Sequence, residues 1–136
     1  MERYRGQSMV ELALITPVLL IMILVTVDGA RVFSAQIAIS NAAREGANYA
    51  SRSYDNANNE LEVRNSALQE LGSAGTVFGV APTVGVEGPD DGCVDSFGYD
   101  CVRVTVNYEF TTLFNFPGLP NQIDLQRTAQ MRILEV

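Results

Sequence analysis

Histidine is absent from this sequence, and cysteine is scarce, with two residues among 136. Histidine is the usual general acid or base near neutral pH, and zinc sites are built mainly from His and Cys. No serine with a plausible base nearby stands out either, so a nucleophilic catalytic centre is not indicated. We therefore expect no metal site, no bound cofactor and no enzymatic activity.

Basic charge is also in short supply. The chain has no lysine, and its nine arginines face sixteen acidic residues, for a net charge of −7. Residues 1–52 hold five Arg against four acids, whereas residues 53–136 hold four Arg against twelve. Nucleic-acid binding needs a concentrated basic face, so we expect no nucleic-acid partner. The charge is therefore uneven: residues 53–136 are acidic, whereas residues 1–52 are nearly neutral.

A stretch of sixteen residues without charge, 12–27, separates Glu11 from Asp28. As a helix it covers about 24 Å, somewhat less than the ~30 Å hydrocarbon core of a bilayer. One further turn toward the N-terminus gives a sufficient length, but it places Glu11 inside the apolar layer. An ionisable group at that depth is costly and normally implies a partner or a function. We predict one transmembrane helix over residues 7–28, in contact with membrane lipid.

The apolar run has two other interpretations, a buried helix of a soluble protein and a secretory signal peptide. A buried helix of a soluble protein would not need apolar residues on every side. A secretory signal peptide would explain Arg3 and Arg5 before the run, but Asp28 and Phe33 stand where a cleavage site needs small residues. A retained anchor is therefore favoured. The two arginines place the N-terminus in the cytoplasm and the chain after Asp28 outside.

A glycine and a glutamate five residues later stand at the head of the apolar helix, at Gly6 and Glu11. A small Gly lets an extended backbone approach a protease at the membrane face. Cleavage between Gly6 and Gln7 would create an α-amino group close to the Glu11 carboxylate. The pattern is similar to that of type IV prepilins, in which the peptidase cuts after the glycine. The alternative is that Glu11 lies among lipid headgroups without a partner.

Further motifs of the first helix narrow this resemblance. They are Val10–Ala13, Pro17, Asp28–Arg31 and Asn41–Ala47. From Gly6 to about Ser51 the chain resembles the TadE-like family, the minor pilins or pseudopilins of the tight-adherence (Tad) pilus and related type IV-like systems.

The resemblance implies an inner-membrane precursor, cleavage by a prepilin peptidase, and a role in pilus assembly or adherence. Its partners would be other pilin-like subunits, contacted through the N-terminal helix, with Gln7 and Glu11 pairing their charges. The sequence departs from type IV pilins at Gln7, where those proteins favour an aromatic residue or Met, so methylation of the new terminus stays open. The alternative function is a membrane-anchored extracytoplasmic binding or enzymatic domain that enters no filament. A third is a secreted domain released by signal peptidase.

Helical periodicity continues past the membrane, so we expect one helix over about 8–51, with Pro17 as a candidate kink. One stripe of its outer part consists mostly of small residues: Val32, Ala35, Ile39, Ala42, Gly46 and Ala50. Small residues permit close approach of another backbone, either the protein's own sheet or a neighbouring helix. The predicted organisation is a leader at 1–6, the span at 7–28, its continuation at 29–52 and an outer domain at 53–136.

The outer domain is expected to be α+β. Asp55–Asn56 can cap a second helix over about 57–71, with Leu61, Leu68 and Leu71 facing inward and Gly72 ending it. Alternating apolar residues predict strands over 102–110 and 123–133, and a third within 76–86 that Pro82 and Gly85 weaken. We expect a small antiparallel sheet of about three strands, packed on the first helix as in pilins.

Three features remain in the outer domain. Cys93 and Cys101 predict a disulfide, since free thiols would require a cytosolic location. Four carboxylates surround that loop, at positions 90, 91, 95 and 100; their spacing fits a solvated acidic loop better than a calcium site. The apolar connection 112–120 is either a partner-contact patch or a segment packed on the second helix.

Overall fold

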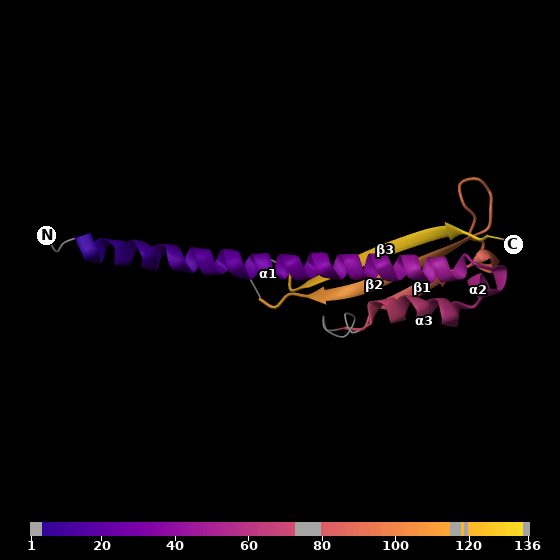
Figure 1. Ribbon diagram of the computed structural model, residues 1–136, viewed down its shortest axis with the longest axis horizontal. Coiled ribbons are helices and arrows are strands. Elements are labelled where there is room, and N and C mark those ends of the chain that lie inside the picture. The colour runs from indigo at the N-terminus through magenta and orange to yellow at the C-terminus, as the bar shows by residue number, and fades with distance from the viewer. Residues whose placement is uncertain (1–3, 73–79, 115–117, 119, 135–136) are drawn as a thin grey trace.

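A long helix carries a small α+β domain on one of its halves. The computed structural model describes residues 4–72, 80–114, 118 and 120–134. Helix α1 (Tyr4–Ala50) is followed by two shorter helices, α2 (Tyr54–Asn58) and α3 (Glu60–Leu71). Figure 1 shows α3 and the strands beside the C-terminal half of α1, while its N-terminal half extends alone. The predicted α+β class is confirmed.

The strands are β1 (Thr83–Glu87), β2 (Cys101–Thr111) and β3 (Gln122–Arg132), with a short 3-10 helix, η1 (Pro89–Asp91), between the first two. They form an antiparallel sheet in the order β1-β2-β3. β2 is central, and its alternate apolar residues from Val102 to Phe110 are buried. β1 is short because Pro82 precedes it directly and cannot donate a ladder hydrogen bond.

Helix α1 is 47 residues long, which corresponds to about 70 Å. It continues on both sides of Pro17, so the proline does not end it; a kink there stays a prediction. Hydroxyl groups within the apolar half bond to the helix itself: Thr16 and Thr26 each donate to the carbonyl four residues earlier, at 2.7 Å. These polar groups are therefore satisfied without water.

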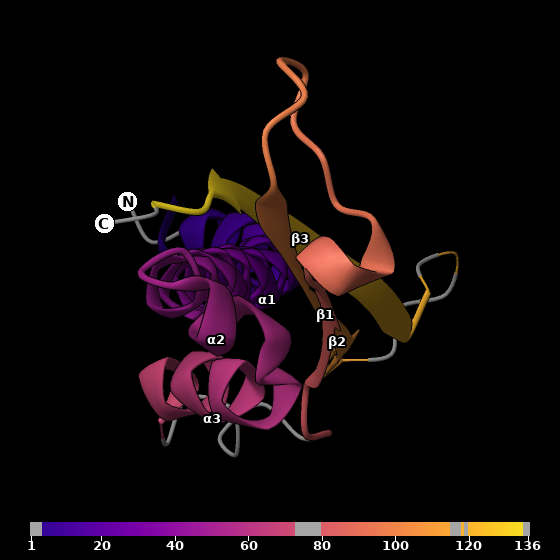
Figure 2. The ribbon, with the colours of Figure 1, turned by 90° about the vertical axis from the view of Figure 1, so that its right-hand side faces the viewer.

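The small-residue stripe of α1 packs on the protein's own sheet and also on α3. Ala42, Ala47 and Ala50 are fully buried. A Cβ atom added at Gly46 would lie 3.1 Å from Ala67 Cβ of α3 and 3.2 Å from Val104 Cγ1 of β2. Gly46 thus marks the point where α1, α3 and the sheet meet. Seen along the long axis, α1 and α3 lie side by side against the sheet (Figure 2).

The prediction of the second helix is wrong in its start and its N-terminal cap. It is divided into α2 and α3, and their N-caps are Ser53 and Asn59 rather than Asp55–Asn56. The Ser53 hydroxyl accepts the Asn56 N–H at 3.2 Å, and the Asn59 side chain accepts that of Glu62 at 3.3 Å. Each short helix is therefore capped separately.

The predicted inward face of this helix is also partly wrong. Leu61 and Leu68 are 68% and 41% exposed, whereas Val63, Ala67 and Leu71 are buried. The buried residues are spaced by four, so they share one side of α3. Ala67 lies on that side because only a small side chain fits against Gly46. The predicted end at Gly72, which has a positive φ of 46°, is confirmed.

Candidate functional site

The N-terminal half of α1 presents an uncovered apolar surface. Among the described residues, one helix is long and apolar enough to cross a membrane; its most apolar 18-residue stretch has a mean hydropathy of 2.6, and none of that stretch is buried. Leu14, Met22 and Ile23 are 71%, 62% and 58% exposed. A soluble monomer rarely exposes so much contiguous apolar surface. This half is consistent with a membrane anchor.

The two residues of the predicted cleavage site, Gly6 and Gln7, lie on the first turns of α1. Gly6 is exposed, and a Cβ atom added there would meet nothing within 4 Å. Since α1 begins at Tyr4, Gly6 is helical in the isolated chain. A protease that binds an extended substrate would have to unwind this turn, which is cheaper at Gly than at other residues. Cleavage after Gly6 stays a prediction.

Gln7 and Glu11 are brought together by the helix. The Gln7 side-chain amide donates to Glu11 Oε1 at 3.2 Å, one turn further along. The carboxylate therefore has a polar partner of its own chain at a depth where it would otherwise lie among apolar side chains. The α-amino group that cleavage would add to Gln7 would stand at the same end of the helix. Charge pairing with that group is untested.

Sequence reasoning missed the most buried carboxylate of the helix, Asp28. It is 8% exposed, and its Oδ1 lies 3.0 Å from the Arg31 guanidinium. Oδ1 also accepts the backbone N–H of Leu113 at 3.2 Å, and Oδ2 accepts that of Phe114 at 3.3 Å. A largely buried carboxylate needs such partners to stay charged. Asp28 ties the helix, where its apolar run ends, to the connection between β2 and β3.

Arg31, the partner of Asp28, also contacts the sheet. Its guanidinium lies 5.0 Å from the centre of the Phe110 ring near the end of β2, a distance suited to a cation–π contact. Asp28 and Arg31 are visible in the sequence as a pair three residues apart. Their partners are not, because Leu113 follows Asp28 by 85 positions and offers only its backbone.

The apolar connection 112–120 meets α1 rather than α3 where it is described. The Thr112 N–H donates to the Asn121 carbonyl at 3.0 Å, which closes the base of the connection. Leu113 is 60% exposed although its backbone is bound to Asp28. Residues 115–117 and 119 of the predicted patch lie outside the described part of the chain.

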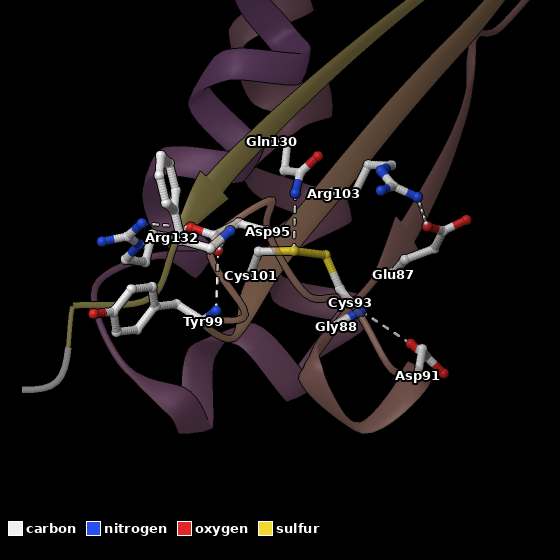
Figure 3. Close-up of a disulfide and its surroundings, with 11 residues drawn as sticks. Glu87, Gly88, Asp91, Cys93, Asp95, Tyr99, Cys101, Arg103, Gln130 and Arg132 are labelled. Atoms are coloured by element: carbon white, nitrogen blue, oxygen red, sulfur yellow. Dashed lines mark hydrogen bonds and ion pairs between the residues drawn. A yellow bond between two sulfur atoms is a disulfide. The ribbon is translucent and has the colours of Figure 1, made fainter.

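The opposite end of the molecule carries the predicted disulfide. Cys93 and Cys101 are bonded, which confirms that prediction, and both are buried. The Cys101 N–H donates to the Cys93 carbonyl at 3.1 Å, and the Gln130 amide lies 3.1 Å from Cys101 Sγ. Figure 3 shows this bond between Cys101, the first residue of β2, and Cys93 in the loop before the strand. The enclosed loop is therefore closed at its base.

Asp95 organises the inside of this loop. Its carboxylate accepts the backbone N–H groups of Phe97 and Tyr99 at 2.8 and 2.9 Å. It also accepts from Arg132 Nε and Nη2, at 2.9 and 2.6 Å (Figure 3). The hydrogen bond from Tyr99 is the main cause that lowers the pKa of Asp95, and Arg132 and Phe97 add to it. The Arg132 guanidinium in turn lies 4.0 Å from the centre of the Tyr99 ring.

The acidic residues around the disulfide have separate partners. Asp90 accepts the Tyr54 hydroxyl at 3.1 Å, and this bond is the main cause that raises the pKa of Tyr54. Asp91 accepts the Gly88 N–H at 3.0 Å, while Asp95 binds Arg132. Within the described part of the chain, no group of three or more His, Cys, Asp or Glu residues is arranged to hold a metal ion.

Comparison with known proteins finds a family match in the amino-terminal part of the chain. A family model described as TadE-like protein matches residues 6–48, which is most of α1. This confirms the resemblance predicted from the motifs of the first helix. TadE-like proteins are a structural, pilus-associated family of pilin-like proteins, not a family of enzymes. No curated protein and no solved structure matches the chain.

Proposed function

We propose, from the match of α1 to TadE-like proteins, that this chain is a pilin-like structural subunit of a Tad or related type IV-like pilus system. It would be made as an inner-membrane precursor with a cytoplasmic N-terminus, cut after Gly6 by a prepilin peptidase, and joined to other pilin-like subunits through α1. The observation that carries the proposal is the uncovered apolar half of α1 with Glu11 near its start.

The shape of α1 suits this role. Its outer half is fixed to the sheet and α3, so the apolar half is held as a projecting rod (Figure 1). Such a rod can exchange lipid contacts for contacts with similar helices, because both present apolar surface. An ordinary anchor needs only the apolar run, and the carboxylate of Glu11 would then serve no purpose.

Glu11 would set the axial position of neighbouring helices. After cleavage, the ammonium group of Gln7 and the positive end of the helix dipole both favour a nearby carboxylate. In the isolated chain the Gln7 amide already bonds to Glu11 at 3.2 Å. In an assembly, Glu11 of one subunit can instead meet the amine of the next. An unpaired charge at that depth costs several kcal/mol, so slipped arrangements would be disfavoured.

The first experiment is N-terminal sequencing of the mature protein made in cells that contain the peptidase. Gln7 at the terminus supports the proposal, Met1 supports a plain anchored domain, and a residue beyond Asp28 supports secretion. Replacing Gly6 with Leu should leave a precursor six residues longer. Normal processing of that variant would contradict cleavage at this site.

The second experiment separates assembly from anchoring. Glu11→Ala makes the span more apolar, so the variant should insert in the membrane and be cleaved like the parent. It should lose crosslinking to other pilin-like subunits of the same cells. Glu70→Ala, which removes an exposed carboxylate of α3, is the matched control and should crosslink normally. Normal crosslinking of the cleaved Glu11→Ala protein would overturn the proposed role of Glu11.

A further inference from the structure

We propose that the outer domain makes its own contact with the membrane, through Leu113, whose backbone is bound to Asp28, and through Phe33, five residues after Asp28 on α1. These two side chains would rest in the outer headgroup layer of the bilayer that α1 crosses. The occupant of this surface is thus lipid, and not another protein. The inference rests on insertion of α1, but not on cleavage or on assembly into a pilus.

The position of the bilayer along α1 follows from the sequence. A helix needs about 20 residues to cross the ~30 Å hydrocarbon core. Counted back from Asp28, the first charged residue after the apolar run, such a helix begins at Met9. Asp28 therefore lies where the hydrocarbon core meets the outer headgroups. Each headgroup layer is about 5–8 Å thick.

The hydrogen bonds of Asp28 fix Leu113 at the same level. The Leu113 N–H lies 3.2 Å from Asp28 Oδ1, and the Phe114 N–H lies 3.3 Å from Oδ2. A carboxylate reaches only a few ångströms from its own backbone, so Leu113 cannot stand far above the edge of the hydrocarbon core. Its side chain is nevertheless 60% exposed. An exposed leucine at this height meets headgroups and upper acyl chains rather than bulk water.

Phe33 adds a second apolar group at a similar height. It follows Asp28 by five residues, which places it about 7.5 Å further along the helix axis, within the headgroup layer. It is 65% exposed. Aromatic side chains favour this region of a membrane. The two charged side chains of the helix between these groups are paired with each other, since Asp28 lies 3.0 Å from Arg31.

A contact of this kind would restrain the tilt of the molecule. The connection after β2 lies on one side of α1, and α1 is fixed to the sheet. Tilting α1 away from that side would lift Leu113 out of the headgroup layer and expose it to water. Because removing an apolar side chain from water is favourable, the contact would favour the orientation in which the outer domain rests on the bilayer.

The absence of tryptophan from the chain makes a direct test possible. The full chain with Leu113→Trp is placed in phosphatidylcholine vesicles at a low ratio of protein to lipid. Nitroxide labels at a shallow or a deep lipid position quench nearby tryptophan. Leu113→Trp and Phe33→Trp should be quenched several-fold more by the shallow label than Phe97→Trp. Phe97 is the matched control, because it is 79% exposed in the disulfide loop at the other end of the molecule.

Val18→Trp, in the middle of the apolar run, reports whether α1 is inserted and should respond to the deep label. If it does, and Leu113→Trp behaves like Phe97→Trp, the proposal is overturned and the surface is left for water or another protein. If Val18→Trp is not quenched, α1 is not inserted and the proposal falls with it. Phe33→Trp serves if Leu113→Trp does not fold. Cleavage after Gly6 is measured separately, so failure here leaves the proposed pilin function standing.

Discussion

The two halves of α1 each present an apolar surface, yet these surfaces are built from side chains of different size. In the anchor half, Leu14 and Met22 are 71% and 62% exposed, whereas in the outer half Ala42 and Ala47 are fully buried. Fluid lipid can fill the space around bulky side chains, but a sheet and a second helix approach closely only over small ones. Among the apolar side chains of α1, size therefore distinguishes the uncovered half from the half that packs on the sheet and α3.

The boundary between the halves is marked by charge. Asp28 is the first ionised residue after the apolar run, and its carboxylate is bonded to Arg31 and to the connection after β2. The apolar half is thus attached to the outer domain by two different means, close packing along the stripe and a small polar cluster where the apolar run ends. The following substitutions act on these two attachments and on the far end of the domain.

The largest effect is expected from Gly46→Leu. A Cβ atom at this position would already lie 3.1 Å from Ala67 Cβ and 3.4 Å from the Val63 carbonyl oxygen, so a whole leucine side chain must push α1 and α3 apart. Overpacking of this kind costs about 3 kcal/mol or more. Urea unfolding of the detergent-solubilised protein, followed by circular dichroism, measures the loss.

Gly29→Leu is the matched control on the same helix. Gly29 is exposed, and an added Cβ would meet nothing within 4 Å. Leucine is the better helix former by about 0.8 kcal/mol, so this variant should be as stable as the parent or slightly more stable. Equal destabilisation by the two substitutions would contradict the comparison between a packed half and an uncovered half.

Loss of the disulfide should have the next largest effect. Replacing both Cys93 and Cys101 with Ala should lower the free energy of unfolding by about 2–3 kcal/mol on the chain-entropy model of a short loop. The change should be confined to the far end, so hydrogen exchange should rise in residues 94–100 and stay unchanged at the buried residues of α1. An unchanged midpoint of unfolding would show that the loop is held by Asp95 and Arg132 alone.

Asp28→Ala should cost about 2 kcal/mol, because it leaves a guanidinium and two backbone N–H groups without their acceptor. Hydrogen exchange of the Leu113 and Phe114 amides should accelerate more than that of the β2 amides. Glu60→Ala is the control: it also removes an ion pair, to Arg64 at 3.0 Å, but both of those side chains are about half exposed. Its effect should stay within about 0.5 kcal/mol. Similar losses for both variants would mean that the Asp28 cluster does not hold the connection.

Much of this fold could be predicted from periodicity and composition. Three patterns each extend over many residues: the apolar run, the small-residue stripe and the alternation along β2. Each prediction is therefore supported by several residues at once. The disulfide followed from the number of cysteines and the expected location. These predictions needed only local patterns, and the structure confirms the helix, the sheet and the bond.

The sequence-based predictions fail where a contact between residues far apart in the chain determines the packing. Leu61 is more hydrophobic than Ala67, so hydrophobicity alone favoured the wrong side of α3 as its inner face. The close approach to Gly46 requires a small residue there, and that requirement comes from another helix. The contacts of Asp28 are likewise not visible in the sequence, where it stands at the end of the apolar run and in the motif Asp28–Arg31. Its partners beyond Arg31 are backbone groups, which every residue except proline offers, so the sequence holds no signal for them.

The smallest expected effect concerns Asp95 and the pH. Its folded pKa is lowered, chiefly by the Tyr99 N–H, with Arg132 adding to the shift. A carboxyl group with a lowered folded pKa stabilises the folded loop above its unfolded pKa of about 3.9. That contribution is lost as the pH falls through the folded pKa, because protonation removes the charge that Arg132 and the two N–H groups bind. The loop should therefore keep its structure throughout the neutral range and loosen only in acid.

The amide resonances of Phe97 and Tyr99 follow this change directly, since both N–H groups donate to Asp95 Oδ1. Their chemical shifts should titrate with a midpoint below the ordinary value of 3.8. In Asp95→Asn the amide oxygen can still accept these bonds but cannot titrate, so the acid transition should vanish. Glu70→Gln removes the same charge from α3 and should leave the transition in place. A midpoint at or above the ordinary value in the parent would mean that Asp95 is not held by these donors in solution. The disulfide would then be the chief constraint on the loop.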